Sequence, residues 1–280
     1  MTQHAQYDQL GIFYDLAYGS NTLGGPDLDL YLGLAKETGG TVLEMGSGTG
    51  RLCIPLAAAG VRVTAMELSH KMLQIADGYA ENHLSAEQRE NLTMVQGDMT
   101  TLQLDDTFGL IIFPYSSLLE VGSEGKVREA IENAFKMLRS PGIMVVDNFY
   151  YGPGGSSRPN AVIRPAKRKE RKPHNLPDGR SVQFEETDWY DEHSGETQRW
   201  LYADIFDGRG IAVERLTFCI SRTYVPPEHM QSMLEEVGFR KEKIALYGSF
   251  DGTTPLDAPC FSDTTSSAYQ RARQVWICQK

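Results

Sequence analysis

Three glycines separated by single residues lie at positions 46, 48 and 50, in the stretch Glu44-Met-Gly-Ser-Gly-Thr-Gly50. They follow one short apolar run and precede another, which predicts a turn from a strand into a helix. Glycine lacks a Cβ, so such a turn lets the main chain approach a ligand closely and direct helix N–H groups at it. Packing glycines are the alternative, but packing rarely places three of them at alternate positions. We therefore expect this turn to bind a ligand.

Two ligand classes use a turn of this kind. Dinucleotide enzymes carry G-x-G-x-x-G, in which the third glycine comes one residue later because a pyrophosphate must fit. The compact G-x-G-x-G that follows Glu44 resembles motif I of the class I S-adenosylmethionine-dependent methyltransferases, whose ligand has no phosphates. A NAD-dependent dehydrogenase is the less favoured alternative, because the late third glycine that its motif requires is missing here.

Three further strand ends fit the same resemblance. Glu67 ends the second expected strand, where an acid can accept hydrogen bonds from both ribose hydroxyls, as it also does in NAD enzymes. Asp98 and Met99 follow the third strand, which resembles the family position where Asp binds the adenine amine beside an apolar residue. Phe113-Pro114-Tyr115 ends the fourth strand, like the family's segment at the methionine and sulfonium end. A single Asp or Glu at a strand end is more often simply exposed to solvent. Because Glu67 and Asp98 together fit the polar groups of one ligand, we favour a role in binding.

The resemblance covers about residues 40 to 150 and implies S-adenosylmethionine as the cofactor. The residues that it implies for cofactor binding are Tyr14, Glu44, Gly46, Gly48, Gly50, Arg51, Glu67, Leu68, Met72, Asp98, Met99 and Phe113. No metal site is expected, because the four cysteines are scattered, with no C-x-x-C pair and no histidine at ligand spacing.

The N-terminus carries a second family cue. The stretch Phe13-Tyr-Asp-Leu-Ala-Tyr18 resembles the Tyr-Asp-x-x-Tyr helix of small-molecule N-methyltransferases, such as the amino-sugar and glycine N-methyltransferase-like enzymes. In that group a tyrosine of this helix closes over the methionine part of the cofactor. The C-terminal run at 247–252 and the final strand also resemble that group. Simple packing of Tyr14 and Tyr18 on the core is an equal alternative.

Alkyl transfer from a sulfonium is an in-line displacement with an excellent leaving group. The protein therefore contributes mainly alignment and exclusion of water, an effect on the order of 7–11 kcal/mol. A base is needed only if the nucleophile arrives protonated. The candidates for base or orienting group are Tyr115, Glu120, Asp147, Asn148, His174 and His193. The catalytic set that we select is Tyr18, Tyr115, Asn148 and Tyr190.

Tyr190 belongs to a segment that is rich in aromatic residues. The set comprises Phe184, Trp189, Tyr190, Trp200, Tyr202 and Phe206. Most of them are expected to form the core of that segment, and one or two could hold the cationic sulfonium by cation–π contact, worth ~0.5–2 kcal/mol each. We select Tyr190 for this contact, with Asn148 beside it at the end of the fifth strand.

The elements that must position these residues follow from the apolar pattern. From residue 41 short β-rich runs alternate with helical stretches, which is typical of a parallel sheet wrapped by helices. The runs are continuous and apolar, as strands buried on both faces should be. The expected fold class is α/β: a Rossmann-like, doubly wound, mostly parallel seven-stranded sheet with an inserted antiparallel β lid.

The insertion divides the chain into three parts. Residues 152–172 are rich in Gly, Pro, Ser and positive charge, and residues 181–225 predict three or four longer antiparallel strands. We assign 1–150 to an N-terminal helix and the cofactor-binding core, 151–225 to the lid, and 226–280 to the C-terminal part of the core sheet. Open α/β sheets bind ligands at the carboxyl ends of their strands, so a sheet inserted there can cover the site.

The overall charge limits the partners. A net charge of −10 and a pI near 5.1 argue against a nucleic-acid or anionic-membrane protein. The sequence shows no signal peptide and no apolar run of the ~20 residues that span a bilayer, so a cytoplasmic location is expected. Six of the nine residues from 164 to 172 are positive, and a solvated loop is favoured there over a site for an anionic substrate. We expect a small-molecule substrate as partner, with a homodimer left open.

The function that these features predict is in-line methyl transfer from S-adenosylmethionine to an amine or hydroxyl of a small molecule. One alternative in the same fold is a cyclase, in which the cofactor's own amine attacks its γ-carbon to give azetidine-2-carboxylate and methylthioadenosine. A second is a non-catalytic S-adenosylmethionine-binding protein. The acceptor atom, the general base and the oligomeric state do not follow from the sequence.

Overall fold

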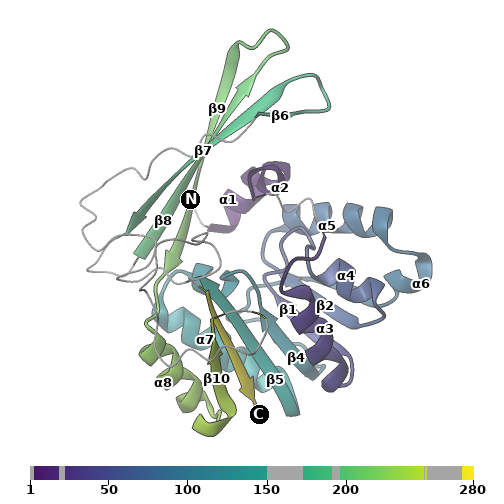
Figure 1. The fold of residues 1–280 in the computed structure, drawn as a ribbon, viewed down its shortest axis with the longest axis vertical. Coiled ribbons are helices and arrows are strands. Elements are labelled where there is room, and N and C mark those ends of the chain that lie inside the picture. The colour runs from purple at the N-terminus through teal and green to yellow at the C-terminus, as the bar shows by residue number, and fades with distance from the viewer. Residues whose placement is uncertain (1–2, 19–22, 150–172, 191–195, 249, 251–272) are drawn as a thin grey trace.

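A seven-stranded sheet forms the centre of the protein, as expected from the apolar runs (Figure 1). The computed structural model describes residues 3–18, 23–149, 173–190, 196–248, 250 and 273–280. The strands of the sheet are β1 (Thr41–Met45), β2 (Arg62–Glu67), β3 (Leu92–Gln96), β4 (Phe108–Phe113), β5 (Leu138–Phe149), β10 (Ile244–Tyr247) and β11 (Arg273–Gln279).

The strand order is β10-β11-β5-β4-β1-β2-β3. Strands β1 to β5 pair in parallel, and β11 pairs antiparallel with both β5 and β10. The order reverses direction at β1, whose neighbours are β2 and β4. Ligands of open α/β sheets bind at such a switch point, beyond the carboxyl ends of the strands.

Helices cover both faces of the sheet. They are α3 (Leu28–Glu37), α4 (Cys53–Ala58), α5 (His70–His83), α6 (Ala86–Arg89), α7 (Glu124–Met137) and α8 (Pro227–Val237), with short 3-10 turns η1 (Ser117–Val121) and η2 (Lys241–Lys243). One apolar core lies between the sheet and η1, α7 and α8, and a second lies between the sheet and α3, α4 and α5. Every residue of β4 is buried, which explains its unbroken apolar sequence.

The boundary between α7 and β5 differs from the sequence prediction. The apolar spacing predicts a helix from about Glu124 to Arg139, and the pair Pro141-Gly142 predicts its end before a strand from Ile143 to Val146. The helix ends at Met137, and β5 begins at Leu138, which pairs with Phe108 before the register shifts. The strand passes through Pro141-Gly142 at this irregularity, because Pro and Gly are tolerated in a strand where the regular ladder is interrupted.

A separate four-stranded antiparallel sheet, here called the lid sheet, confirms the predicted insertion. Its strands are β6 (His174–Asn175), β7 (Ser181–Tyr190), β8 (Glu196–Phe206) and β9 (Ala212–Thr223), in the order β6-β7-β8-β9. Alternate residues of β8 and β9 are buried, as expected for a sheet with one covered face.

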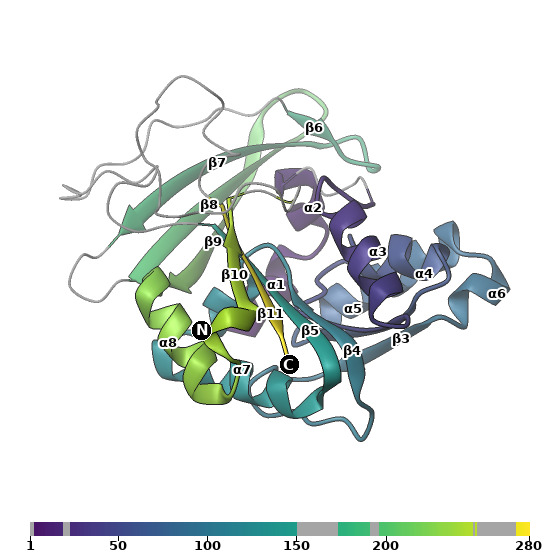
Figure 2. The same ribbon diagram turned by 60° about the horizontal axis from the view of Figure 1, so that its bottom comes forward.

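The N-terminal helices α1 (Gln3–Leu10) and α2 (Ile12–Tyr18) provide that cover. Leu10 and Ala17 are buried in one apolar cluster with residues of the lid sheet, and both helices lie between the two sheets in Figure 1. The apolar side chains of both helices pack on the lid sheet, while Asp8 and Asp15 accept hydrogen bonds from Ser69 and Thr49 of the core. The division of the chain at residues 150 and 225 stays a prediction. Figure 2 shows the same arrangement, with the lid sheet over the ends of the central strands.

Candidate functional site

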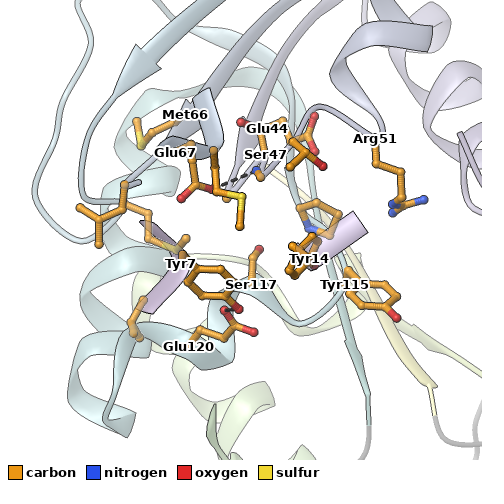
Figure 3. A pocket seen from close by; sticks show the side chains of 18 of the residues that line it. Tyr7, Tyr14, Glu44, Ser47, Arg51, Met66, Glu67, Tyr115, Ser117 and Glu120 are labelled. Carbon is orange, nitrogen blue, oxygen red and sulfur yellow. Dashed lines mark hydrogen bonds between the residues drawn. The ribbon is translucent and has the colours of Figure 1, made fainter. Parts of the chain in front are cut away.

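A cavity of about 620 Å³ lies beyond the carboxyl ends of β1 to β4, between the central sheet and helices α1 and α2. Figure 3 shows Glu44, Ser47 and Glu67 along one wall, with Tyr7, Ser117 and Glu120 facing them. Twelve of the sixteen residues selected from the sequence line this cavity: Tyr14, Tyr18, Glu44, Gly46, Gly48, Arg51, Glu67, Leu68, Met72, Asp98, Met99 and Tyr115.

The glycine turn connects β1 to α4, and its three glycines all have positive φ. A Cβ on Gly46 would lie 2.6 Å from the Cβ of Ser117, so only glycine allows that close approach. A Cβ on Gly48 would meet nothing within 4 Å, which is consistent with its place at the cavity. Gly50 does not line the cavity, and its Cβ would lie 2.7 Å from Cδ1 of Ile54. Packing against α4 therefore accounts for Gly50.

Glu67 ends β2 and holds two segments of main chain with its two oxygens. Oε2 accepts a hydrogen bond from the N–H of Gly48 at 2.9 Å, and Oε1 accepts one from the N–H of Ser69 at 2.9 Å. Burial raises the pKa of this carboxyl, and the two N–H groups act in the opposite direction. Ser69 caps α5 by accepting a hydrogen bond from the N–H of Met72. The carboxylate is thus fixed in one orientation at the cavity wall.

Glu44 lies deeper, at 1% exposure, and one of its oxygens is unsatisfied. Among the described residues, neither Oε2 of Glu44 nor Oγ of Ser47 has a hydrogen-bond partner, although both side chains line the cavity. Burial raises the pKa of Glu44 to about 8, against the opposing charge of Arg51. Buried polar atoms are usually paired, so these two oxygens are suited to a donor on a ligand, such as an ammonium group.

The loop after β3 presents Asp98 and Met99 to the cavity. Oδ1 of Asp98 accepts hydrogen bonds from the N–H of Thr100 at 2.8 Å and from its hydroxyl at 2.7 Å. The buried side chain of Asn133 on α7 donates to the carbonyls of Met99 and Leu102, at 3.0 and 2.7 Å. We did not predict a role for Asn133, and its sequence signal is a polar residue on the apolar face of α7.

Arg51 lines the cavity, and its guanidinium forms a two-pronged ion pair with Asp27. Nη1 and Nη2 donate to the two carboxylate oxygens at 2.8 and 2.7 Å. Burial acts to lower the pKa of Arg51, but the hydrogen bonds and charge of Asp27 outweigh it and leave the pKa raised. The guanidinium groups of Arg51 and Arg273 lie 5.8 and 5.6 Å from the centre of the Tyr115 ring. Asp27 was not predicted, because nothing local in its sequence indicates a partner so far along the chain.

Tyrosines of α1 and α2 form the wall on the lid side. The rings of Tyr7 and Tyr14 are 5.9 Å apart, and those of Tyr14 and Tyr18 are 4.9 Å apart. Burial raises the pKa of all three phenols, that of Tyr18 to about 12, so they remain neutral. Tyr7, which we did not predict, donates to Oε2 of Glu120 at 2.5 Å.

Tyr115 owes its position to the turn after β4. It has a φ of 53° and Ser116 has a φ of 67°, a region that non-glycine residues seldom occupy. The N–H of Tyr115 donates to Oδ2 of Asp147 at 3.0 Å. Arg273 also binds Asp147, which is fully buried and does not line the cavity. Asp147 therefore orients Tyr115 and Arg273 and is not placed to act as a base on a ligand.

Four selected residues do not line the cavity. Gly50 packs on α4, as described above, and Phe113 is fully buried in the core between the sheet and α7. Asn148 is buried on β5 beside β11, where its Oδ1 has no partner among the described residues. The backbone of Tyr190 ends β7, but its side chain is outside the described residues, as is the candidate base His193. His174 lies on β6 against the ring of Phe184.

Two further features concern metal binding and membrane spans. In the described parts of the chain, no three His, Cys, Asp or Glu side chains are grouped so that they could hold a metal ion. No helix of those parts is long and apolar enough to cross a membrane.

Part of the chain is similar in sequence to known methyltransferases. Residues 42–142 match the family model described as a methyltransferase domain. "Putative methyltransferase GWCH70_2453" of Geobacillus sp. (strain WCH70) is 31% identical over 106 residues, which are 38% of this chain and 41% of that protein. "Putative methyltransferase YqeM" of Bacillus subtilis (strain 168) is 29% identical over 109 residues, which are 39% of this chain and 42% of that protein. The chain thus matches about two fifths of the length of these relatives.

Solved structures match almost the whole chain. The CcbJ methyltransferase from Streptomyces caelestis has a TM-score of 0.68 at 18% identity, over 98% of this chain and 96% of that one. The sugar N-methyltransferase KedS8 from Streptoalloteichus sp. ATCC 53650 has a TM-score of 0.68 at 18% identity, over 97% and 94%. The amino pentose methyltransferase CalS10, with bound S-adenosylmethionine, has a TM-score of 0.64 at 16% identity, over 95% and 96%. This protein therefore has the class I S-adenosylmethionine-dependent methyltransferase fold.

Proposed function

From this fold and the methyltransferase domain at residues 42–142, we propose that the protein transfers the methyl group of S-adenosylmethionine to a small-molecule acceptor. One observation carries the proposal. Glu44, Glu67 and Asp98 come from the carboxyl ends of three neighbouring strands, and all three line one cavity with the glycine turn. Three separate acids thus face a single ligand-sized space, which is what a ligand with several hydrogen-bond donors requires.

The cavity residues fit the chemical groups of this cofactor. Glu67 is fixed by two N–H groups and would accept hydrogen bonds from the ribose hydroxyls. Asp98 would accept from the adenine amine beside Met99, and the unsatisfied oxygens of Glu44 and Ser47 would accept from the ammonium of the methionine part. When bound, the cofactor supplies a methyl group on a sulfonium, which is an excellent leaving group.

The side chains around the acceptor end would align the acceptor and exclude water. Tyr14, Tyr18 and Tyr115 line the cavity with aromatic rings, and such rings favour a cation by about 0.5–2 kcal/mol for each good contact. Exclusion of water and alignment of the two reactants carry most of the rate effect in such a displacement. Among the catalytic residues selected from the sequence, Tyr18 and Tyr115 are supported by their place at the cavity. Asn148 and Tyr190 have no comparable support.

The acceptor is proposed to be an amine. Two of the similar structures are named as a sugar N-methyltransferase and an amino pentose methyltransferase. An ammonium must lose one proton before attack, and the lone pair of the neutral amine then forms the N–C bond as the C–S bond of the sulfonium breaks. The product is a methylammonium, a cation that an aromatic wall tolerates.

Product analysis tests the proposal. The pure protein is incubated with S-adenosylmethionine and a panel of amines, and the expected product is S-adenosylhomocysteine that depends on the acceptor. Asp98→Ala should weaken cofactor binding at least tenfold in calorimetry, while Asp105→Ala, an exposed aspartate downstream of the same strand, should not change it. Methylthioadenosine formed without an acceptor would instead establish the cyclase, and cofactor binding without any product would establish a binding protein.

A further inference from the structure

The N-terminal helices and the lid sheet share an apolar core of their own. In the described parts of the chain, the buried members of this core lie on α1 and α2 and between positions 176 and 220, and none comes from the central sheet and its helices, here called the central domain. Ala17 of α2, for example, is fully buried in one cluster with Phe184 of β7 and Leu201 of β8. Pulling the helices away from the lid sheet would expose such side chains to water, which is unfavourable. The two helices and the lid sheet therefore form one unit, called the cover below.

The cover meets the central domain through polar contacts. The hydroxyl of Ser69, at the start of α5, donates to Oδ1 of Asp8 on α1 at 2.5 Å. The hydroxyls of Thr49 and Tyr79 donate to the two oxygens of Asp15 on α2, at 2.7 and 2.9 Å. When such groups separate, water replaces each partner, so the net cost of breaking the hydrogen bond is a fraction of its strength in an apolar medium. The boundary between the cover and the central domain thus opens more readily than the apolar core of the cover.

Glu120 holds both parts of the cover with one carboxylate. It lies on η1, between β4 and α7, and it lines the cavity. Its Oε2 accepts a hydrogen bond from the hydroxyl of Tyr7 on α1 at 2.5 Å, and Figure 3 shows the two side chains next to each other. Its Oε1 accepts from Nε and Nη2 of Arg222 on β9, at 2.9 and 2.8 Å. The N-terminal helices and the lid sheet are thus attached to the same side chain of the central domain.

The ion pair in this contact is shielded from solvent. The side chains of Arg222 and Glu120 are 7% and 16% exposed. Shielding strengthens the attraction between two charges, because less water lies around them to screen it. Opening of the cover lets water reach both groups, and their hydration offsets much of the lost attraction. The pair therefore stabilises the closed form and still permits opening.

The cover forms one wall of the cavity. Tyr7, Tyr14 and Tyr18 line the cavity from α1 and α2, whereas Glu44 and Glu67 line it from the central sheet. Displacement of the cover therefore widens the cavity and lets a ligand enter or leave. Opening of such an element limits the rate of ligand release in many enzymes.

We propose that Glu120 is the latch of this cover: its release from Tyr7 and Arg222 lets the cover open as one unit, and this step sets the rates at which S-adenosylmethionine enters and leaves the cavity. The identity of the ligand rests on the proposed function, whereas the latch itself does not. During opening the apolar core of the cover stays packed, because the contacts that break are the polar ones at the boundary.

A latch and a ligand-binding residue affect the binding rates differently. A latch stabilises the closed form both with and without ligand, so its loss raises the association and dissociation rates by the same factor and leaves Kd unchanged. The loss of a direct contact with the ligand raises mainly the dissociation rate and therefore weakens binding. A residue that only stabilises the fold changes neither rate.

Stopped-flow fluorescence with S-adenosylmethionine measures both rates. Glu120→Gln keeps the size of the side chain but removes its charge, and both rates are expected to rise by roughly tenfold or more, with Kd within about twofold of the parent value. Arg222→Lys keeps the positive charge but loses the two adjacent donors, and a smaller rise of both rates is expected. Glu129→Gln, at an exposed position of α7 outside the cavity, is the matched control and should change neither rate.

Hydrogen exchange of the ligand-free protein tests the latch independently of the cofactor. The N–H of Lys71, in the first turn of α5, donates to Oδ1 of Asp8 across the boundary at 3.3 Å. In Glu120→Gln, exchange should become faster in this turn, because the whole cover separates from the central domain more often. Exchange in β8 should stay at the parent rate, since β8 pairs with β7 and β9 inside the lid sheet.

The two measurements together decide the proposal. A joint rise of both rates at constant Kd, with faster exchange confined to the boundary, supports the latch. Unchanged rates in both Glu120→Gln and Arg222→Lys, a rise of the dissociation rate alone, or faster exchange throughout the lid sheet overturns it. If S-adenosylmethionine does not bind to the parent protein, the proposed function fails, and the hydrogen-exchange result alone decides on the latch.

Discussion

Glu67 joins the glycine turn to the start of α5, because its two oxygens accept the N–H groups of Gly48 and Ser69, each at 2.9 Å. The first N–H belongs to the turn after β1 and the second to the turn after β2. One carboxylate therefore sets the distance between two loops that line the cavity. Both the shape of the cavity and the stability of its wall depend on this residue.

Glu67→Gln is expected to affect both properties. The amide nitrogen cannot accept a hydrogen bond, so one of the two N–H groups loses its acceptor and the other keeps only a neutral one, at a cost of about 1.5–3 kcal/mol. We expect the Kd for S-adenosylmethionine to rise at least tenfold and the free energy of unfolding to fall, as measured by calorimetry and urea denaturation. Glu87→Gln, at an exposed position of α6, is the control. Parent-like cofactor affinity in Glu67→Gln would show that this residue does not bind the ribose.

Two glycines of the turn should respond differently to alanine. Gly48 has a φ of 56° and open space around a Cβ, so Gly48→Ala is expected to cost only about 1–2 kcal/mol of stability but to weaken cofactor binding strongly. Gly50 has a φ of 92°, and its Cβ would lie 2.7 Å from Cδ1 of Ile54, so Gly50→Ala should lose more stability. Urea denaturation and calorimetry on both variants test the difference. Equal losses of stability would contradict the separate roles.

Glu44 makes the stability depend on pH. Burial raises its pKa from 4.5 to about 8, so the folded protein keeps a proton that the unfolded chain has released between those values. The free energy of unfolding should therefore fall as the pH rises from about 5 to about 8. Glu44→Gln removes this dependence. The free energy of unfolding of the variant, minus that of the parent, should therefore be larger at pH 8 than at pH 5 by roughly 1–3 kcal/mol, as measured by urea denaturation. A parallel pH profile for parent and variant would show that Glu44 is ionised throughout.

Cofactor affinity should depend on pH in the opposite direction. An ammonium group near Glu44 favours the ionised carboxylate, so the affinity of the parent for S-adenosylmethionine is expected to rise between pH 6 and pH 8. The affinity of Glu44→Gln should be weaker and nearly constant over that range. Calorimetry at three pH values distinguishes the two profiles.

The hydroxyl of Tyr7 connects α1 to the central domain through Glu120. Tyr7→Phe removes a hydrogen bond to a carboxylate, and we expect a loss of about 1.5–3 kcal/mol in the free energy of unfolding. Because α1 covers the cavity, the dissociation rate of S-adenosylmethionine should also increase, as measured by stopped-flow fluorescence. Tyr202→Phe, on the outer face of the lid sheet, should change neither quantity.

Local sequence patterns were sufficient for the fold and for most of the selected residues that line the cavity. The glycine turn depends on backbone conformation, which the spacing of the glycines indicates directly. Glu67 and Asp98 follow from the positions where short apolar strands end. Parallel strands bring their carboxyl ends to one edge of the sheet, so residues distant in sequence could be assigned to one site.

The strand runs and turn signals of β7 to β9 likewise predicted an antiparallel sheet. The expectation that most of its aromatic residues form its core was wrong for β8, because Trp200 is exposed and Tyr202 and Phe206 lie on the same, outer face. Phe184 is the described member of that set that is buried in the core.

Long-range pairing was decided only by the tertiary structure. Tyr7 and Arg222 meet Glu120 across more than 100 residues of sequence, and no local pattern encodes such a contact. The direction of Tyr115 depends on a left-handed turn held by Asp147, whereas Phe113, two residues earlier, faces the core. Periodicity and spacing determine which residues form strands, turns and buried faces, because these depend on neighbours along the chain. Which polar side chains share a cavity depends on how separate elements pack, and that is set by the whole fold.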